Sequence, residues 1–170
     1  MTDIFTERLI LRPLTLETCR SIAAGVPDEQ NWAPGYPTEG DHVVASIALE
    51  AGDRHDASTP WGPFQICMRD EALTAIGGVG ALHPPDSAGE LEIGYGIAES
   101  VRGQGLATEA VTGFIDSIRR FGVNTVVALI SPENSASQAC AKRSGLTFEH
   151  LVRTDQDGQM QRWVLHLDIV

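Results

Sequence analysis

The chain has 170 residues, of which 42% are hydrophobic and 21% charged, and its formal net charge is −11 at pH 7. This length suits one domain over residues 1–170, and the apolar fraction excludes a disordered chain. The acidic balance argues against nucleic acid as a partner, because phosphates require a basic surface. It is compatible with a cationic acceptor such as an amine, and equally with a role in solubility alone.

Targeting and cysteine patterns indicate a cytoplasmic protein. No window approaches the roughly 18 consecutive apolar residues that a membrane span requires, so no membrane association is expected. The first residues lack the basic start and apolar stretch of a signal peptide. Cys19, Cys67 and Cys140 form no CxxC pair and have no histidine at ligand spacing, which predicts reduced, mostly buried thiols and no metal site. The sequence leaves the oligomeric state open, a homodimer included.

The first half of the chain mixes strand and helix patterns. Apolar and β-branched runs bounded by turn residues predict strands over 9–14, 61–68, 74–82 and 90–97. Helical spacing of apolar residues predicts helices over 16–24 and 42–51.

Two loops of this half carry aromatic or imidazole side chains that are candidates for ligand binding. The loop over 26–40 is longer than most connections and holds Trp32 and Tyr36, which favours a binding role. His83 begins a proline-rich loop over 83–89. Packing is the alternative role for the aromatic residues.

The second half predicts a crossover and a hairpin. Residues 105–121 carry one apolar helical face and end at Gly122, and a buried strand follows over 125–130, parallel to the strand over 90–97. Asn134 caps a helix that runs to about Ser144. The tail forms a hairpin of strands over 146–153 and 160–169, with Trp163, Leu165, Leu167 and Ile169 on one face of the last strand. The predicted fold is α/β: a mixed, mostly antiparallel sheet with helices on both faces.

A glycine-rich turn separates the strand over 90–97 from the long helix. Gly103 and Gly105 let the backbone approach a ligand closely, and the first amides of the helix point outward without partners. With the helix dipole behind them, these amides predict a site for a phosphate or pyrophosphate.

Other phosphate-binding motifs do not fit this turn. A dinucleotide fingerprint requires a third glycine where Thr108 stands, and an acid about 20 residues further on. A Walker A loop requires Gly-Lys-Ser/Thr, which is absent. A plain connection between strand and helix is the remaining alternative, and the position at a helix start makes it the weaker one.

Three segments resemble the GNAT superfamily of N-acetyltransferases. Arg102-x-x-Gly105-x-Ala107 matches its Q/R-x-x-G-x-G/A signature on the expected strand, turn and helix. Asn134-x-x-Ser137 followed by Lys142-Arg143-Ser144-Gly145-Leu146 resembles its second conserved segment. The opening over 6–14 and the run over 92–95 are similar to the RimJ/RimL-like branch, which contains ribosomal-protein N-terminal acetyltransferases.

The resemblance implies a splayed pair of parallel strands with acetyl-CoA between them. The pantetheine arm would pair with the backbone near Ile97 and Ala98, and Asn134 would reach the same arm or serve only as a helix cap. Arg143 could meet the phosphates of the nucleotide. The expected pyrophosphate site comprises Arg102, Gly103, Gln104, Gly105, Leu106, Ala107 and Thr108.

Direct attack of a neutral amine on the thioester, in a ternary complex, is the reaction that the resemblance implies. The loops that carry Trp32, Tyr36 and His83 should flank the thioester, so these residues are candidates for the acceptor pocket. This reaction needs a base for the ammonium proton and a proton for the departing thiolate. Glu92 shares a strand face with Gly94 and Gly96, whose lack of side chains leaves a furrow beside it. Glu92 is our candidate for the base. Glu90 is the second choice and a candidate contact for the substrate. The alternative for Glu92 is a solvated carboxylate or one that only anchors the substrate.

The chain departs from the family pattern at two catalytic positions. Ala141 stands where many members have a tyrosine that protonates the thiolate, and Leu129 stands where some have a glutamate. Ser137 remains the best hydroxyl near the sulfur. Positioning of the reactants could then carry much of the rate.

Three functions are compatible with these observations. The first is an N-acetyltransferase acting on a protein or peptide N-terminal amine. The second acetylates a small amine such as an antibiotic, a polyamine or an amino acid. The third is a non-catalytic acyl-CoA-binding module, which the absence of the tyrosine keeps open.

Overall fold

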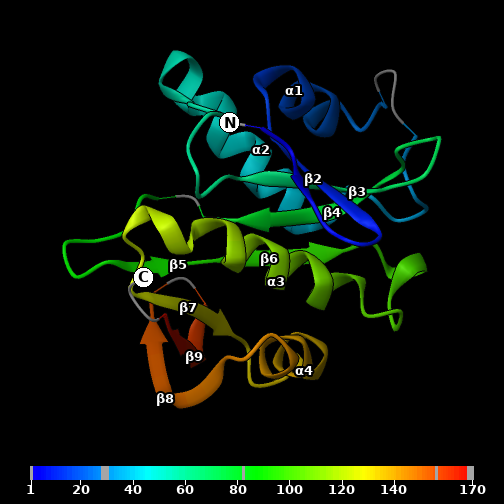
Figure 1. Ribbon diagram of the computed structural model, residues 1–170. Coiled ribbons are helices and arrows are strands. Elements are labelled where there is room, and N and C mark those ends of the chain that lie inside the picture. Colours follow the sequence, from blue (N-terminus) through cyan, green and yellow to red (C-terminus); the bar gives the residue numbers. More distant parts are fainter. Residues whose placement is uncertain (1, 28–30, 82, 156, 168–170) are drawn as a thin grey trace.

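The computed structural model describes residues 2–27, 31–81, 83–155 and 157–167, whose strands form two sheets (Figure 1). The first sheet is antiparallel throughout, in the order β1 (Ile4–Phe5), β2 (Leu9–Pro13), β3 (Phe64–Met68), β4 (Ala75–Gly80) and β6 (Gly94–Ile97). In the second sheet β5 is parallel to β7 and the other pairs are antiparallel. Its order is β5 (Glu90–Glu92), β7 (Thr125–Ile130), β9 (Gly158–His166) and β8 (Thr147–Thr154).

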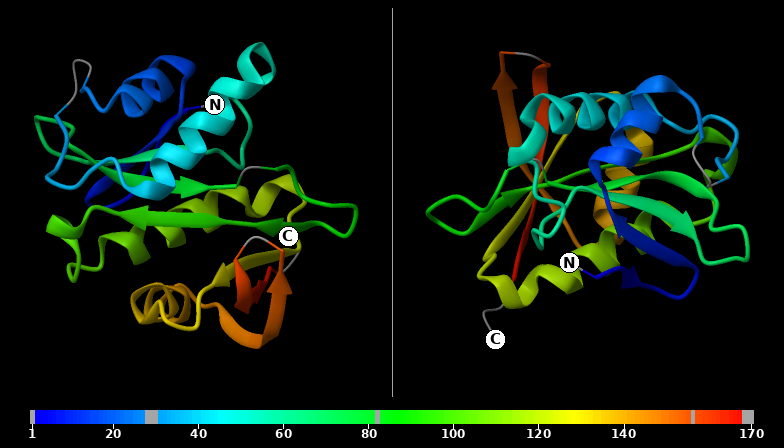
Figure 2. Two further views of the ribbon diagram at one scale, coloured as in Figure 1. Left: turned by 180° about the vertical axis from the view of Figure 1, so that it is seen from behind. Right: turned by 90° about the horizontal axis from the view of Figure 1, so that it is seen from above.

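Helices cover both faces of the first sheet. Figures 1 and 2 show α1 (Leu16–Ala24) and α2 (Glu39–Ala51) on one face and α3 (Leu106–Ile118) on the other, with α4 (Ser135–Arg143) beside the second sheet. Short 3₁₀ turns are η1 (Gly52–Arg54), η2 (Glu99–Val101) and η3 (Arg119–Phe121). The predicted mixed, mostly antiparallel α/β architecture is therefore confirmed. Within the described ranges, no helix combines the length and apolarity needed to cross a membrane.

The hydrophobic core includes buried residues of α1, α2, α3 and both sheets. The helix buries the face that its spacing predicts: Leu106, Ala110, Val111, Phe114, Ile115 and Ile118. Gly122 follows at φ +78°, a left-handed conformation that suits glycine at a helix end. This packing holds the N-terminus of α3 against the junction of the two sheets.

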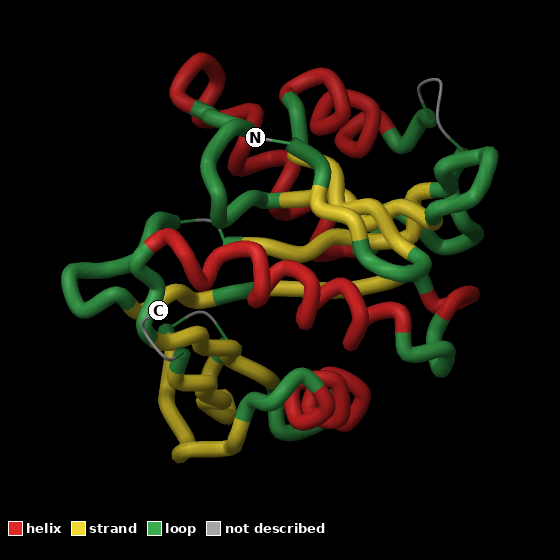
Figure 3. The backbone as a smooth tube through the Cα atoms, in the orientation of Figure 1, coloured by secondary structure: helices red, strands yellow, loops and turns green. Residues whose placement is uncertain are grey.

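The stretch predicted as one strand over 90–97 is two strands that belong to different sheets. The Ile93 amide donates to the Val127 carbonyl at 2.8 Å, and from Gly94 onward the chain pairs with β4 instead. Figure 3 shows the interruption between β5 and β6. The predicted parallel pair is confirmed for β5 and β7, and beyond Ile93 the chain leaves β7 and opens the expected splay.

Several element ends differ from the prediction for local reasons. α2 begins at Glu39, earlier than predicted, because Thr38 and Asp41 form a capping box. β3 begins only at Phe64, since Pro63 has no amide hydrogen for a ladder bond. α3 gives way after Ile118 to a 3₁₀ turn. The predicted ends at residues 82 and 169 lie outside the described residues.

Candidate functional site

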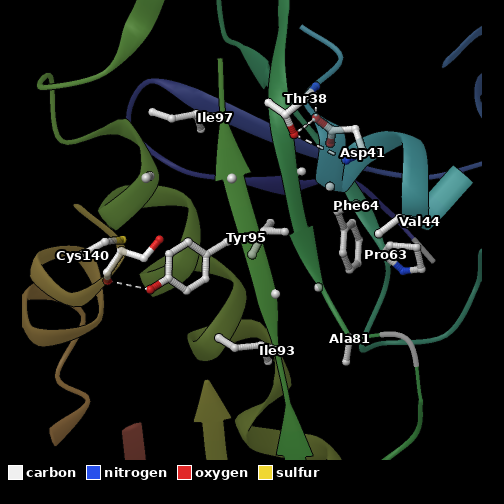
Figure 4. Close-up of a pocket in the computed structure, with 18 of the residues that line it drawn as sticks. Thr38, Asp41, Val44, Pro63, Phe64, Ala81, Ile93, Tyr95, Ile97 and Cys140 are labelled. Atoms are coloured by element: carbon white, nitrogen blue, oxygen red, sulfur yellow. Dashed lines mark hydrogen bonds between the residues drawn. The ribbon is translucent and has the colours of Figure 1, made fainter. Parts of the chain in front are cut away.

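A cavity of about 1530 Å³ opens where β6 leaves β7. Its lining runs from the N-terminal turn of α2, across β4 and β6, to the start of α3 and the inner side of α4 (Figure 4). Among the lining residues, Arg102 and Arg143 lie toward α3 and α4, whereas Asp41 lies on α2 and Glu92 ends β5. The cavity therefore has a basic end and an acidic end.

The basic end is built around the start of α3. Gly105 caps the helix at φ +77°, and the amides from Gly103 to Thr108 donate to no other described residue. Open amides at a helix N-terminus favour an anion. Arg143 donates from Nε to the Thr108 hydroxyl at 3.3 Å, which holds its guanidinium beside these amides. The residues fit a pyrophosphate.

Arg8 supports this turn from the N-terminal segment. Its Nη1 donates to the Gln104 carbonyl at 3.1 Å, and its Nε lies 2.7 Å from Glu109 Oε2. Burial would raise the pKa of Glu109, but hydrogen bonds from Thr6 and Arg8 hold it below its ordinary value. Gln104 does not line the cavity, so only its backbone amide remains a candidate contact for the pyrophosphate. The sequence motif that contains Arg8 did not reveal this contact.

The two backbone positions predicted to meet pantetheine differ. The Ala98 amide already donates to the Ile76 carbonyl at 2.7 Å, and its carbonyl accepts from Val101. In an antiparallel ladder, the backbone N–H and C=O of every second residue point to the partner strand. Because the Ala98 amide points to β4, the N–H and C=O of Tyr95 and Ile97 point to the open edge of β6. Ile97 also lines the cavity, whereas Ala98 does not. The geometry therefore favours Ile97 over Ala98 as the backbone contact for pantetheine.

The inner side of α4 faces β6 across the cleft. Asn134 accepts a hydrogen bond from the Ser137 amide at 3.0 Å, as a helix cap does, and both residues line the cavity. The Tyr95 hydroxyl donates to the Ser137 carbonyl at 2.8 Å, and its ring extends from β6 toward α4 (Figure 4). Burial raises the pKa of Tyr95, so the hydroxyl stays protonated. The sequence contains Tyr95 in a recognised motif but did not single it out.

A floor without side chains lies between β4 and β6. Gly78 pairs with Gly96 and Gly80 pairs with Gly94, so four glycines meet in two directly opposed pairs. A Cβ built on Gly94 would meet nothing within 4 Å. The sequence predicts only the β6 half of this furrow, because pairing with β4 is a tertiary feature.

The two predicted carboxylates have different surroundings. Glu90 Oε2 lies 2.6 Å from Arg162 Nη2, and Arg162 Nε lies 3.2 Å from Glu149. Glu92 is exposed, lines the cavity and makes no hydrogen bond or ion pair with a described residue. Of the two, Glu92 has the carboxylate that is available to a ligand.

Of the three predicted acceptor contacts, two line the cavity. Tyr36 is buried and accepts a hydrogen bond from Gln65 Nε2 at 2.9 Å, while His83 is exposed at the rim. Burial, followed by the nearby Asp41 charge, raises the pKa of Tyr36. Trp32 does not line the cavity: it bridges to Ala75 and packs edge-on against Tyr36, with ring centroids 5.3 Å apart. Its position fits the alternative of packing.

Two buried polar side chains on the acidic side were not predicted as site residues. Asp41 is 8% exposed and Gln65 is 4% exposed, and both line the cavity. The spacing of Thr38 and Asp41 signals a helix cap, but nothing local signals burial. In the part of the chain that the structure describes, no group of three or more His, Cys, Asp or Glu could hold a metal.

Comparisons with known proteins agree with this geometry. YjdG, an uncharacterised N-acetyltransferase of Bacillus subtilis (strain 168), is 26% identical over 100 residues, which are 58% of this chain. The alignment spans 56% of that relative's length. An acetyltransferase from Agrobacterium tumefaciens is similar in structure, with a TM-score of 0.67, 25% identity and coverage of 98% of this chain and 95% of its own.

RimL, a ribosomal L7/L12 α-N-protein acetyltransferase solved in complex with coenzyme A, has the same fold. Its TM-score is 0.72 at 16% identity, over 99% of this chain and 100% of that one. Residues 8–147 match the acetyltransferase (GNAT) domain family. The sequence match covers most of the chain, and the splayed strands and the open amides before α3 accord with it: the protein belongs to the GNAT family of acetyltransferases.

Proposed function

We propose that the protein transfers an acetyl group from acetyl-CoA to a primary amine, and that the acceptor is a protein or peptide N-terminus. One observation carries the proposal: the open amides from Gly103 to Thr108 face the same cavity as the carboxylate of Glu92, which pairs with no described residue. A thioester held from the basic end could then meet an amine held at the acidic end.

Acetyl-CoA enters as a substrate held by the residues of the basic end. The amides from Gly103 to Thr108, with Arg102 and Arg143, suit its pyrophosphate. Asn134 and the free backbone edge at Ile97 suit its pantetheine arm. The RimL structure solved with coenzyme A supports this assignment through its shared fold.

The reaction exchanges a C–S bond for a C–N bond and removes two protons from the acceptor nitrogen. The amine nitrogen attacks the thioester carbon, the C–N bond forms, and the C–S bond breaks to release the thiolate. The proton that the attacking nitrogen loses after the attack neutralises this thiolate, which gives the amide and the free thiol of coenzyme A. In the proposal Glu92 takes the proton from the ammonium, directly or through water. Ser137 is the hydroxyl that can hydrogen-bond the leaving sulfur, while the Tyr95 proton is engaged by the Ser137 carbonyl.

The charges around the furrow support a cationic acceptor. Five acidic residues line the cavity: Glu39, Asp41, Asp86, Glu90 and Glu92. One of them, Glu90, is offset by Arg162. A peptide N-terminus or a small amine is positively charged before it reacts, so this end attracts both.

Thiol release from acetyl-CoA in the presence of an amine panel tests the proposal. The panel contains peptides with free N-termini, the same peptides with acetylated N-termini, and small amines. We expect release with free peptides and none with the acetylated ones. Release only with small amines would assign the second function, and release with no amine would contradict an acetyltransferase activity.

Arg8→Ala is expected to weaken acetyl-CoA binding indirectly, because Arg8 supports the turn but does not line the cavity. Losing the bonds to Gln104 and Glu109 frees the turn, and we expect roughly a tenfold rise in the dissociation constant, a loss of about 1.4 kcal/mol. Calorimetry measures it. Arg119→Ala is the matched control, because it removes a surface ion pair with Asp116 near the other end of α3. Equal acetyl-CoA affinities of the two variants would show that Arg8 does not support the turn.

A further inference from the structure

The buried carboxylate of Asp41 has one oxygen that its own fold leaves unused. Its Oδ2 accepts from the Thr38 amide at 2.8 Å and from the Thr38 hydroxyl at 2.6 Å. Its Oδ1 accepts no hydrogen bond from a described residue. The side chain as a whole is only 8% exposed, but Oδ1 itself stays accessible, so a charged ligand can pair with it.

The free oxygen lies over the glycine floor of the furrow. A Cβ built on Gly78 would stand 2.6 Å from Asp41 Oδ1, and one built on Gly96 would stand 3.8 Å from Thr38 Oγ1. Figure 4 shows Thr38 and Asp41 at the start of α2, on the far side of β4 and β6 from Cys140. The absence of side chains at this pair of strands therefore gives Oδ1 access to the cavity.

The neighbours of this oxygen suit an ammonium group. The buried Tyr36 hydroxyl accepts from Gln65 and keeps further acceptor capacity, and the Asp41 charge lies close enough to raise the pKa of Tyr36. Burial likewise raises the pKa of Asp41, against hydrogen bonds from Thr38 that lower it. Val44, Pro63 and Ala81 line the same side and offer apolar contact for a methylene chain (Figure 4).

This position is distinct from that of Glu92. Gly78 pairs with Gly96, and Glu92 precedes Gly96 by four residues along β5 and β6. At a rise of about 3.3 Å per residue, Glu92 and Gly96 lie about 13 Å apart along the strand. Amines bound beside the Glu92 and Asp41 carboxylates would then be on the order of 10 Å apart. An amine that reacts beside Glu92 thus leaves Asp41 free for another part of the same molecule.

We propose that the acceptor carries a second ammonium group, roughly 10 Å from the amine that is acetylated, and that Asp41 binds it. The inference rests on the proposed function and narrows its acceptor. Two sources have this chemistry: a peptide with lysine near its free N-terminus, and a linear polyamine. In an extended peptide the lysine would occupy the second or third position.

The test compares acceptors that differ only in the second charge. One arm uses peptides with lysine or its neutral isostere norleucine at position two or three. The other uses linear diamines and monoamines of equal length. Thiol release should give at least about a tenfold lower KM for the charged member in one arm, equivalent to about 1.4 kcal/mol. The arm that shows the preference identifies the source.

Asp41→Asn tests the residue. Its remaining oxygen can still cap Thr38, so we expect an unaltered acetyl-CoA affinity, while the preference for the charged acceptor falls to within about twofold. Glu50→Gln removes an exposed acid at the other end of α2 and should keep the preference. If Asp41→Asn does not fold, Gly78→Ala keeps the charge but places a Cβ 2.6 Å from Oδ1, so the carboxylate must shift and the same preference should be lost.

Two results would overturn the inference while leaving acetylation intact. One is equal KM values for charged and neutral acceptors in the unaltered protein. The other is a preference that persists in Asp41→Asn or falls equally in Glu50→Gln. Absence of thiol release with every amine would instead contradict the proposed function, and this inference with it.

Discussion

Replacing Gly105 by valine is expected to lower the affinity for acetyl-CoA by at least about a hundredfold. The residue caps α3 at φ +77°, where a β-branched side chain is strained, so the turn must change its conformation. Losing two charge-assisted hydrogen bonds from the displaced amides, at roughly 1.5 kcal/mol each, corresponds to that factor. Calorimetry with acetyl-CoA measures it.

The structure refines how this substitution acts. The nearest atom to a Cβ on Gly105 is Arg8 Nη2, at 3.8 Å, so the added side chain is directed at the residue that supports the turn. Gly122→Val is the matched control: its φ is +78°, and its Cβ meets nothing within 4 Å. Both variants should lose similar stability in thermal unfolding, but only Gly105→Val should lose affinity. A normal acetyl-CoA affinity in a folded Gly105→Val protein would show that the pyrophosphate does not bind at this turn.

Glu92→Gln is expected to lower the turnover rate by about a hundredfold or more, which is the lower range for losing a general base. Acetyl-CoA affinity should not change, because Glu92 lies at the acidic end of the cavity. The fall in rate at low pH that reports the base should also disappear from the pH–rate profile. Steady-state thiol release over a pH series provides both measurements.

The control for this variant is Glu99→Gln, an exposed acid in η2 outside the cavity lining. It should retain the full rate. A near-normal rate and an unchanged pH profile in Glu92→Gln would leave Glu92 as an anchor for the substrate or a solvated charge. A raised acceptor KM with unchanged turnover would specify the anchoring role.

Sequence alone was sufficient for features that depend on neighbours along the chain. The amphipathic spacing of α3, the glycine at its start and the buried run of β7 each follow from residues within one or two turns of each other. Family motifs lie on these same local elements. For this reason the predicted fold class agrees with the structure, and the proposed anion site has the expected open amides.

Tertiary structure decided the features that depend on residues distant in sequence. Pairing of β6 with β4 brings two further glycines into the furrow, and the Ala98 amide donates to Ile76 of β4. The break at Ile93 divides one predicted strand between two sheets. Trp32 bridges to Ala75, and this long-range contact fits the alternative of packing. The spacing from Thr38 to Asp41 signals a cap, but only the packing of α2 over Gly78 desolvates that carboxylate and turns its free oxygen to the furrow, because burial is a property of the assembled core.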